Sequence, residues 1–175
     1  PSMDVQAADI DQDGDLDILL ANEFKANTIL INNGKGQFEG ESEHRLPQPV
    51  HDSEDVVVRD FNQDGLPDVL FCSEDDKVHE FYLNQGKGVF AKAEYQFPDS
   101  EANAVVAADL NGDKKPDVIF GNNGQNTVYI NQGKGVFKAD DKRLPVLTKI
   151  TQDLALLDID KDGDLDLFEA NEDGN

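Results

Sequence analysis

The sequence predicts an all-β fold made of repeated four-stranded antiparallel sheets, and three observations support this prediction. An acidic phrase, DIDQDGDLD at residues 9–17, recurs as DFNQDGLPD from 60, DLNGDKKPD from 109 and DIDKDGDLD from 158. A second phrase, NxGKGxF, follows each of the first three at nearly the same period. The runs between the phrases are short and rich in β-branched and aromatic residues, as in strands. A unit of about 50 residues with four short strands is typical of a β-propeller blade.

Each repeat is expected to supply its elements in the same order. The first strand precedes the acidic loop, as in residues 56–61 and 104–110, and the second follows it as LDILLA, PDVLFC, PDVIFG and LDLFEA. The third strand is expected in NTILIN, HEFYLN and NTVYIN. The NxGKG segment then forms a tight hairpin, and a fourth strand begins at QFEGESEHRL or its equivalents.

The period divides the chain into three blades and the first half of a fourth. We expect the blades at about residues 1–50, 51–100, 101–147 and 148–175. A lone blade cannot bury both faces of its sheet, so neighbouring blades must stack. By their recurrence, Phe38, Phe90 and Phe137 are predicted to be core residues. The single cysteine, Cys72, stands where other repeats have alanine or glycine, and is predicted to be a small buried residue.

Composition narrows the class of partner. Fifteen basic residues against 37 acidic ones give a formal net charge of −22, which disfavours nucleic acid and anionic membranes and favours cations. We therefore expect no nucleic-acid partner and no membrane insertion, since no apolar run approaches the roughly 20 residues that cross a bilayer. The first residues carry no signal-peptide pattern.

The acidic phrases predict four Ca²⁺ sites. Counted from its first aspartate, each loop has a side-chain oxygen at positions 1, 3, 5 and 9, and Ca²⁺ takes six to eight oxygen ligands. A backbone carbonyl at position 7 is expected to add one ligand. A solvated acidic turn is the alternative, but it does not require this register four times. The predicted ligands are Asp9, Asp11, Asp13, Asp15 and Asp17; Asp60, Asn62, Asp64, Leu66 and Asp68; Asp109, Asn111, Asp113, Lys115 and Asp117; and Asp158, Asp160, Asp162, Asp164 and Asp166, of which Asp15, Leu66, Lys115 and Asp164 act through the backbone.

The four sites are not expected to be equal. The first and fourth loops bring four carboxylates each and the others three, so the outer two should bind more tightly. Glycine at position 6 permits a positive φ in Gly14, Gly65 and Gly163. The third loop has Lys114 there and Gly112 two places earlier, and a non-glycine residue at positive φ costs about 1 kcal/mol. We expect this site to be the weakest.

The fourth loop alone also fits an EF-hand or dockerin-like pattern. DIDKDGDLDLFE places Glu169 at position 12, where an EF-hand has its bidentate glutamate. The other loops carry Leu20, Phe71 and Phe120 there, which cannot bind a cation, and all flanks look like strands. The cysteine and the histidines His44, His51 and His79 lie outside the loops, which disfavours a transition metal.

The D-x-[DN]-x-D-G-x-x-D loop between short strands, repeated about every 50 residues and followed by NxGxGxF, resembles the FG-GAP and VCBS-type repeats of integrin-α-like β-propellers. The resemblance covers essentially the whole chain, although strict Phe-Gly-Ala-Pro tetrapeptides are absent. It implies a ring of usually seven blades with Ca²⁺ in the hairpins of one face and partners on the other. Seven blades need about 350 residues at this period, so we expect the chain to be a fragment of a longer protein.

The strand order places the acidic loops and the NxGKG hairpins on one rim. The other rim carries segments that differ between repeats, and a specific partner could be recognised there. The alternative for any single loop is that its surface sequence varies between repeats without a functional reason. These variable segments are EFKA (23–26), SEDDKVH (73–79), NNGQN (122–126), and residues 47–55, 97–103 and 144–152.

These features favour a Ca²⁺-stabilised extracellular binding or adhesion module with a protein or carbohydrate ligand on the variable rim. One alternative is a lectin, although tryptophan is absent and the aromatic candidate on that rim is Phe24. The other is the non-catalytic part of a larger secreted enzyme. We predict no enzymatic activity because no nucleophile motif is present; His79 could be a base, but an exposed turn histidine is the commoner case. Loops without a bidentate glutamate suit high Ca²⁺ concentrations, which favours an extracellular or cell-surface location.

Overall fold

The computed structural model describes residues 1–146, 148–172 and 174, and these residues form an all-β array of blades, as predicted. The first sheet contains β1 (Ser2–Ala8), β2 (Asp17–Asn22), β3 (Thr28–Asn32) and β4 (Phe38–Gly40). The second contains β5 (Ser53–Arg59), β6 (Asp68–Ser73), β7 (Glu80–Asn84) and β8 (Phe90–Lys92). The third contains β9 (Ala102–Ala108), β10 (Asp117–Asn122), β11 (Thr127–Asn131) and β12 (Phe137–Ala139), and the last pairs β13 (Thr151–Leu157) with β14 (Asp166–Asn171).

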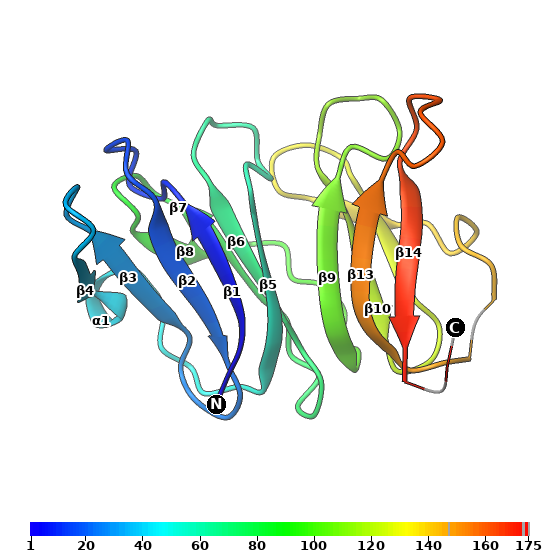
Figure 1. The fold of residues 1–175 in the computed structure, drawn as a ribbon, viewed down its shortest axis with the longest axis horizontal. Helices are drawn as coiled ribbons and strands as arrows, with labels where there is room; N and C mark the ends of the chain where they lie inside the picture. The colour runs from blue at the N-terminus through cyan, green and yellow to red at the C-terminus, as the bar shows by residue number, and fades with distance from the viewer. Residues whose placement is uncertain (147, 173, 175) are drawn as a thin grey trace.

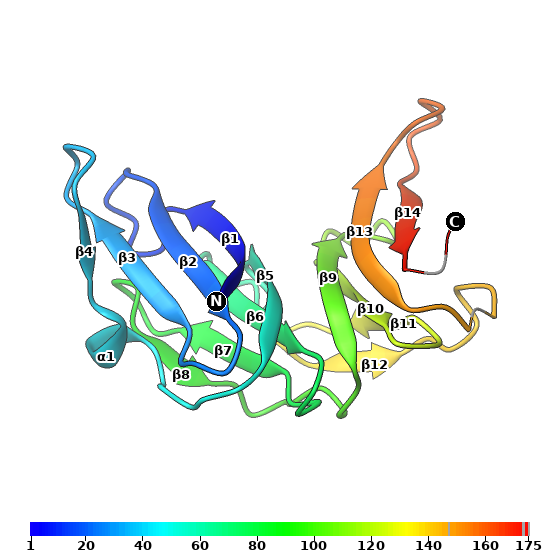
Figure 2. The ribbon, with the colours of Figure 1, turned by 60° about the horizontal axis from the view of Figure 1, so that its bottom comes forward.

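The sheets stand side by side with their strands in antiparallel order (Figure 1). The first strand of each sheet contacts the first strand of the next, so β1, β5, β9 and β13 follow the concave side of an arc (Figure 2). No helix in the described part of the chain is long and apolar enough to cross a membrane.

The hydrophobic core lies between the sheets. Ile10, Leu19 and Phe71 belong to a cluster shared by the first and second sheets. A second cluster joins the second and third sheets through edge-to-face aromatic contacts, such as Phe61 with Phe137 at 5.9 Å between ring centroids. Because each core needs both neighbours, the central strands β6 and β10 are buried along their whole length, as stacking of blades requires.

The recurring phenylalanines differ in burial. Phe90 and Phe137 are each 5% exposed and pack toward the preceding sheet, whereas Phe38 is 43% exposed. The prediction that Phe38 is a core residue is therefore wrong in this structure, because no described sheet precedes the first one. Cys72 is fully buried, as predicted.

The fourth strand of the first blade is shorter than predicted. It ends at Gly40, and the following residues form a helical turn, α1 (Ser42–Arg45). The Ser42 hydroxyl accepts a hydrogen bond from the Ile29 N–H at 2.8 Å, and the Arg45 side chain pairs with Glu41 four residues earlier at 2.6 Å. The contact with β3 and the i,i+4 ion pair together favour a turn over further strand pairing.

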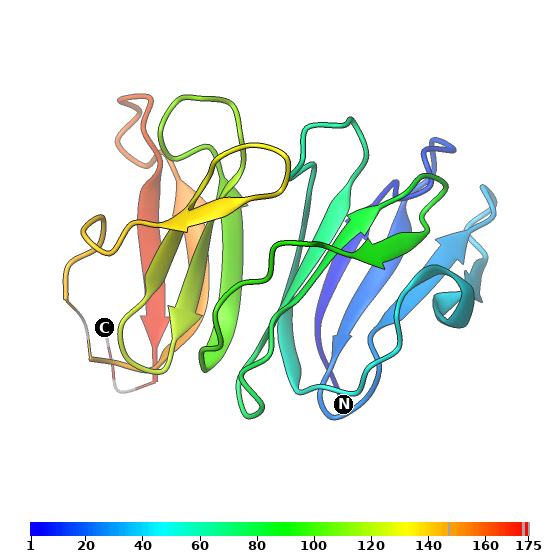
Figure 3. The same cartoon turned by 180° about the vertical axis from the view of Figure 1, so that it is seen from behind.

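The two rims have the predicted composition. The acidic loops join the first and second strands, and the NxGKG hairpins join the third and fourth, so both lie at the same end of each sheet (Figure 3). The variable segments lie at the opposite end. There each first strand also has a register irregularity near its start, for example between Ser53 and Asp55 in β5. Such bulges redirect the side chain of the extra residue.

Candidate cation-binding loops

The first aspartate of each acidic loop organises the backbone around it. Asp9 accepts hydrogen bonds from the N–H groups of Asp13 and Gly14, both at 3.1 Å. Asp60 accepts the equivalent bonds from Asp64 and Gly65 at 3.1 and 2.9 Å. Equivalent bonds are made by Asp109 to Asp113 and Lys114, and by Asp158 to Gly163.

The aspartate at position 5 tightens the same curl. Its Oδ1 oxygen accepts a hydrogen bond from the N–H of position 7 at 2.8 to 3.0 Å in every loop. The position-7 residue therefore has its backbone held beside the carboxylate cluster. These bonds involve the N–H of position 7, so the ligand role of the carbonyls of Asp15, Leu66, Lys115 and Asp164 stays a prediction. The four pairs are Asp13 with Asp15, Asp64 with Leu66, Asp113 with Lys115, and Asp162 with Asp164.

The position-9 aspartates fasten the base of each loop to its sheet. Asp17, Asp68 and Asp117 are fully buried. One oxygen of Asp68 accepts from the Phe61 N–H at 3.0 Å and the other from the Asn84 N–H at 2.9 Å, which ties the loop to β7. Burial raises the pKa of Asp68 to about 7 and also raises that of Asp117.

Positions 1, 3 and 5 converge in the outer two loops. One oxygen from each of Asp9, Asp11 and Asp13 lies within 4.8 Å of the others, and the same is true of Asp158, Asp160 and Asp162. The Oδ1 oxygen of Asp11 is buried without a hydrogen-bond partner in the described structure. Burial, followed by the charges of Asp17 and Asp13, raises the pKa of Asp11. An all-oxygen donor set with an unpartnered oxygen fits a hard divalent cation.

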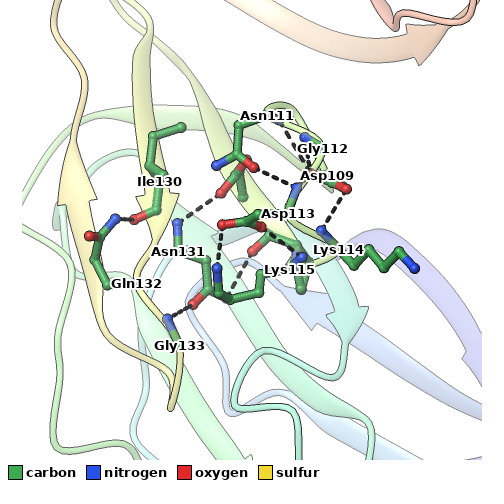
Figure 4. A network of polar contacts seen from close by, with 12 residues as sticks. Asp109, Asn111, Gly112, Asp113, Lys114, Lys115, Ile130, Asn131, Gln132 and Gly133 are labelled. Atoms are coloured by element: carbon green, nitrogen blue, oxygen red, sulfur yellow. Dashed lines mark hydrogen bonds and ion pairs between the residues drawn. The ribbon is translucent and has the colours of Figure 1, made fainter.

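The inner two loops have asparagine at position 3 instead. Asn62 accepts from the Asp64 N–H at 2.8 Å, and Asn111 accepts from the Asp113 N–H at 2.9 Å. In the third loop the Lys115 ammonium also contacts the Asp113 carboxylate (Figure 4). This contact lowers the pKa of Asp113 and places a positive charge where a cation is predicted.

The prediction that backbone strain is specific to the third loop is wrong. Positions 4 and 6 both have positive φ in all four loops. The third loop has glycine at position 4 and lysine at position 6, whereas the others have the reverse, so each loop holds one non-glycine residue at positive φ. The values at positions 4 and 6 are Gln12 63° and Gly14 97°, Gln63 64° and Gly65 88°, Gly112 81° and Lys114 65°, and Lys161 64° and Gly163 99°.

The asparagines of the NxGKG phrase connect neighbouring blades, a role that sequence reasoning missed. The Asn84 side chain donates to the carbonyl of Ile10 in the preceding loop at 2.8 Å and to Pro67 in its own loop at 3.1 Å. Asn131 repeats this with Phe61 at 2.9 Å and Pro116 at 3.0 Å. The recurrence of these asparagines at one position of each repeat was the available signal in the sequence, but recurrence does not indicate which group the side chain contacts. The acidic loops are thus part of the contact between blades.

The remaining predictions about individual residues divide. The acidic loops are flanked by strands in the described structure, so the EF-hand alternative is wrong, and Glu169 lies in β14 with its Oε1 accepting from Asn126 at 2.8 Å. His79 is buried and not an exposed turn residue: its ring stacks on Phe120 at 4.4 Å, and burial lowers its pKa to about 4. Phe24 is exposed on the variable rim, as expected.

Comparison with known proteins agrees with this geometry. The chain matches the FG-GAP-like repeat family over residues 9–71, 60–120 and 109–169, so it belongs to that family. Each matched range begins at the first aspartate of an acidic loop: Asp9, Asp60 or Asp109. No curated protein sequence matches the chain.

Three solved structures share the fold at low sequence identity. A lectin of Agrocybe aegerita, described as recognising non-reducing terminal N-acetylglucosamine, is 23% identical with a TM-score of 0.56; the match covers 93% of this chain and 45% of the lectin. The Tc holotoxin pore of Photorhabdus luminescens is 22% identical with a TM-score of 0.56, covering 93% and 8% of the two chains. BBS1N, solved in complex with ARL6DN, is 13% identical with a TM-score of 0.59, covering 98% and 51%. The match thus spans about half the length of the lectin and of BBS1N, and a much smaller share of the holotoxin chain.

Proposed function

We propose that this chain is a Ca²⁺-stabilised segment of a β-propeller binding module. The observation that carries the proposal is the convergence of the position-1, 3 and 5 oxygens in loops that recur in register, with the buried Asp11 Oδ1 lacking a partner. Bound Ca²⁺ would supply positive charge among these carboxylates. Four such ions would change the formal net charge from −22 to −14.

The chain's own residues explain why binding would matter for stability. The curled loops present the Ile10 and Phe61 carbonyls to Asn84 and Asn131 of the next blade. A cation that holds a loop in its curl therefore also preserves the contact between blades. Binding to the folded state alone stabilises it by mass action.

The sites are proposed to differ in affinity. The first and fourth loops have three converging carboxylates at positions 1, 3 and 5, whereas the second and third replace one by asparagine. The third loop should be weakest because the Lys115 ammonium competes at Asp113. Backbone strain gives no reason for this order, since all loops share it.

The partner is proposed to bind the variable rim, in an extracellular or cell-surface setting. The rim offers different side chains in each blade, including the exposed Phe24, and loops of this type suit the high Ca²⁺ concentration outside cells. A protein ligand in adhesion is our first choice. Carbohydrate binding is the second, favoured by the fold shared with a lectin. We propose that the chain itself has no catalytic role.

Calorimetric Ca²⁺ titration, combined with thermal melting in chelator, tests the metal proposal. We expect about four binding events and a large fall in melting temperature on chelation. Asp11→Asn combined with Asp13→Asn should remove one event, whereas Glu39→Gln on the exposed β4 should remove none. Absence of both heat and a melting shift would refute the proposal.

A glycan array and an activity screen, each with Phe24→Ala as a variant, then distinguish the classes of ligand.

A further inference from the structure

We propose that the rim opposite the acidic loops carries a separate divalent-cation site, formed by Asp52, Glu54 and Glu74 of the second blade. One carboxylate oxygen from each residue lies within 4.8 Å of the others. Asp52 immediately precedes β5, Glu54 lies at its bulge, and Glu74 follows β6. Since β5 is seven residues long, about 20 Å of strand separates this cluster from the Asp60 loop.

An unpartnered buried oxygen points to a missing ligand. Asp52 is only 2% exposed. Its Oδ2 oxygen accepts a hydrogen bond from the Asp75 N–H at 3.0 Å, but its Oδ1 oxygen has no partner in the described structure. None of the three carboxylates forms an ion pair with a basic side chain among the described residues. Buried carboxylates normally have such compensation.

The third blade shows how the same backbone positions are satisfied without a ligand. Residues 49 positions later are Glu101, Asn103 and Asn123. The Asn123 side chain donates to Glu101 at 2.9 Å, and Lys77 pairs with Glu101 at 2.6 Å. Asn103 donates to the Thr151 carbonyl at 3.1 Å. The second blade has carboxylates at all three positions, so the described side chains at these positions offer no equivalent donors.

The chemistry of the cluster selects the kind of cation. Burial and the charges of Asp52 and Glu74 raise the pKa of Glu54 to about 7, which reflects the uncompensated negative charge there. Three carboxylates without sulfur or imidazole suit a hard cation such as Ca²⁺ or Mn²⁺. Such an ion would join the start of β5 to the end of β6 and would hold the bulge in place.

Paramagnetic broadening by Mn²⁺ distinguishes this site from the hairpin loops. In the ¹⁵N-labelled full chain we expect broadening of amides at residues 52–54 and 74–75, as well as near the acidic loops. Glu54→Gln should abolish the first effect and leave the second unchanged. The matched control, Glu101→Gln in the third blade, should change neither.

Thermal melting gives a second measure. In chelator, Glu54→Gln should raise the melting temperature because it removes repulsion between the three carboxylates. Addition of Mn²⁺ should raise the melting temperature of the variant by less than that of the wild type. Broadening confined to the acidic loops, or broadening at residues 52–54 that persists in Glu54→Gln and in Asp52→Asn, would overturn this proposal. Broadening at residues 52–54 and 74–75 alone would support it and refute the loop proposal, so the two can fail independently.

Discussion

Single residues in the acidic loops adopt conformations that their side chains disfavour. Lys114 has φ of 65° at position 6, where the other loops have glycine. Gly112, at position 4, has φ of 81°, where the other loops have glutamine or lysine. The left-handed conformation costs an L-residue about 1 kcal/mol, so moving the glycine leaves the total cost of the loop unchanged.

Substitutions at these two positions should have opposite effects. We expect Lys114→Gly to raise the free energy of unfolding by up to about 1 kcal/mol because strain is relieved, and Gly112→Ala to lower it by about the same amount. Chemical denaturation in chelator measures both without a contribution from bound metal. A loss of stability in Lys114→Gly would show that the lysine side chain contributes more than its conformation costs.

A pair of carboxylates at the concave side of the arc makes stability depend on pH. Asp4 and Asp55 both accept from the Val56 N–H, and Asp55 also accepts from Val105 of the next blade at 2.8 Å. Burial, followed by the hydrogen bond with Asp4, raises the pKa of Asp55 to about 8. Between about pH 4 and pH 8 the folded state therefore keeps a proton that the unfolded state loses, so stability falls as pH rises through this window.

Asp55→Asn should remove this dependence. The amide oxygen can still accept from Val105, and no charge forms at high pH. We expect the variant to be nearly equal to the wild type in stability at pH 4 and more stable at pH 8, by up to about 5 kcal/mol, since one pKa unit corresponds to about 1.4 kcal/mol and the shift spans about four units. Denaturation curves across this range in chelator measure the difference. Equal slopes with pH for both proteins would contradict the assignment.

At the scale of the element, the NxGKG hairpin connects its blade to the acidic loop of the preceding blade. Its asparagine reaches the preceding acidic loop, and its second glycine lies directly against that loop: a Cβ at Gly88 would lie 3.3 Å from the Asp11 Cβ and 3.4 Å from Ile10. Gly88 also has φ of 65°. Close approach and backbone conformation therefore both favour glycine at this position.

Removing the asparagine side chain of this hairpin should lower the free energy of unfolding more where a preceding blade is present. Asn84→Ala leaves the buried Ile10 carbonyl without this donor, and we expect a loss of about 1–3 kcal/mol in the free energy of unfolding. Asn32→Ala is the matched control, because its side-chain amide donates to the Leu16 carbonyl of its own blade at 3.1 Å and no described blade precedes it. Urea unfolding compares the two. Equal losses would show that the bond between blades contributes nothing specific.

At the scale of the whole molecule, burial of a repeat position depends on its neighbour. Ile10 and Phe61, at position 2 of their loops, are fully buried by the following blade, whereas Ile159 at the same position is 63% exposed. Leu157, Leu165 and Phe168 are also exposed in the last sheet. The array therefore leaves one apolar face uncovered in the described structure.

Truncating the same position in two blades tests this dependence. Ile10→Ala should destabilise the protein by about 2–5 kcal/mol because it leaves a cavity in the core between sheets. Ile159→Ala should change stability by less than about 0.5 kcal/mol, as exposed substitutions do. Chemical denaturation of both variants gives the comparison. A large loss in Ile159→Ala would show that this face is covered in solution.

Local sequence was sufficient for the strands, the curled loops and the rim on which they lie. Alternating and β-branched runs predict strands, and Asp, Asn and Gly at set spacings predict turns, because both depend on nearest neighbours along the chain. The same local patterns indicated the converging positions 1, 3 and 5. The helical turn at Ser42 was missed because its contacts with Ile29 lie 13 residues away in the chain.

Only the tertiary structure decided which members of a repeated set are buried and which carboxylates lack partners. Phe38 and Phe90 occupy the same repeat position, yet in the described structure only Phe90 has a preceding sheet to pack against. Asp52, Glu54 and Glu74 come together because strand pairing brings the start of β5 beside the end of β6, about 20 residues away. Repetition in sequence sets the geometry of one blade, but burial and compensation of charge depend on what the adjacent blade presents.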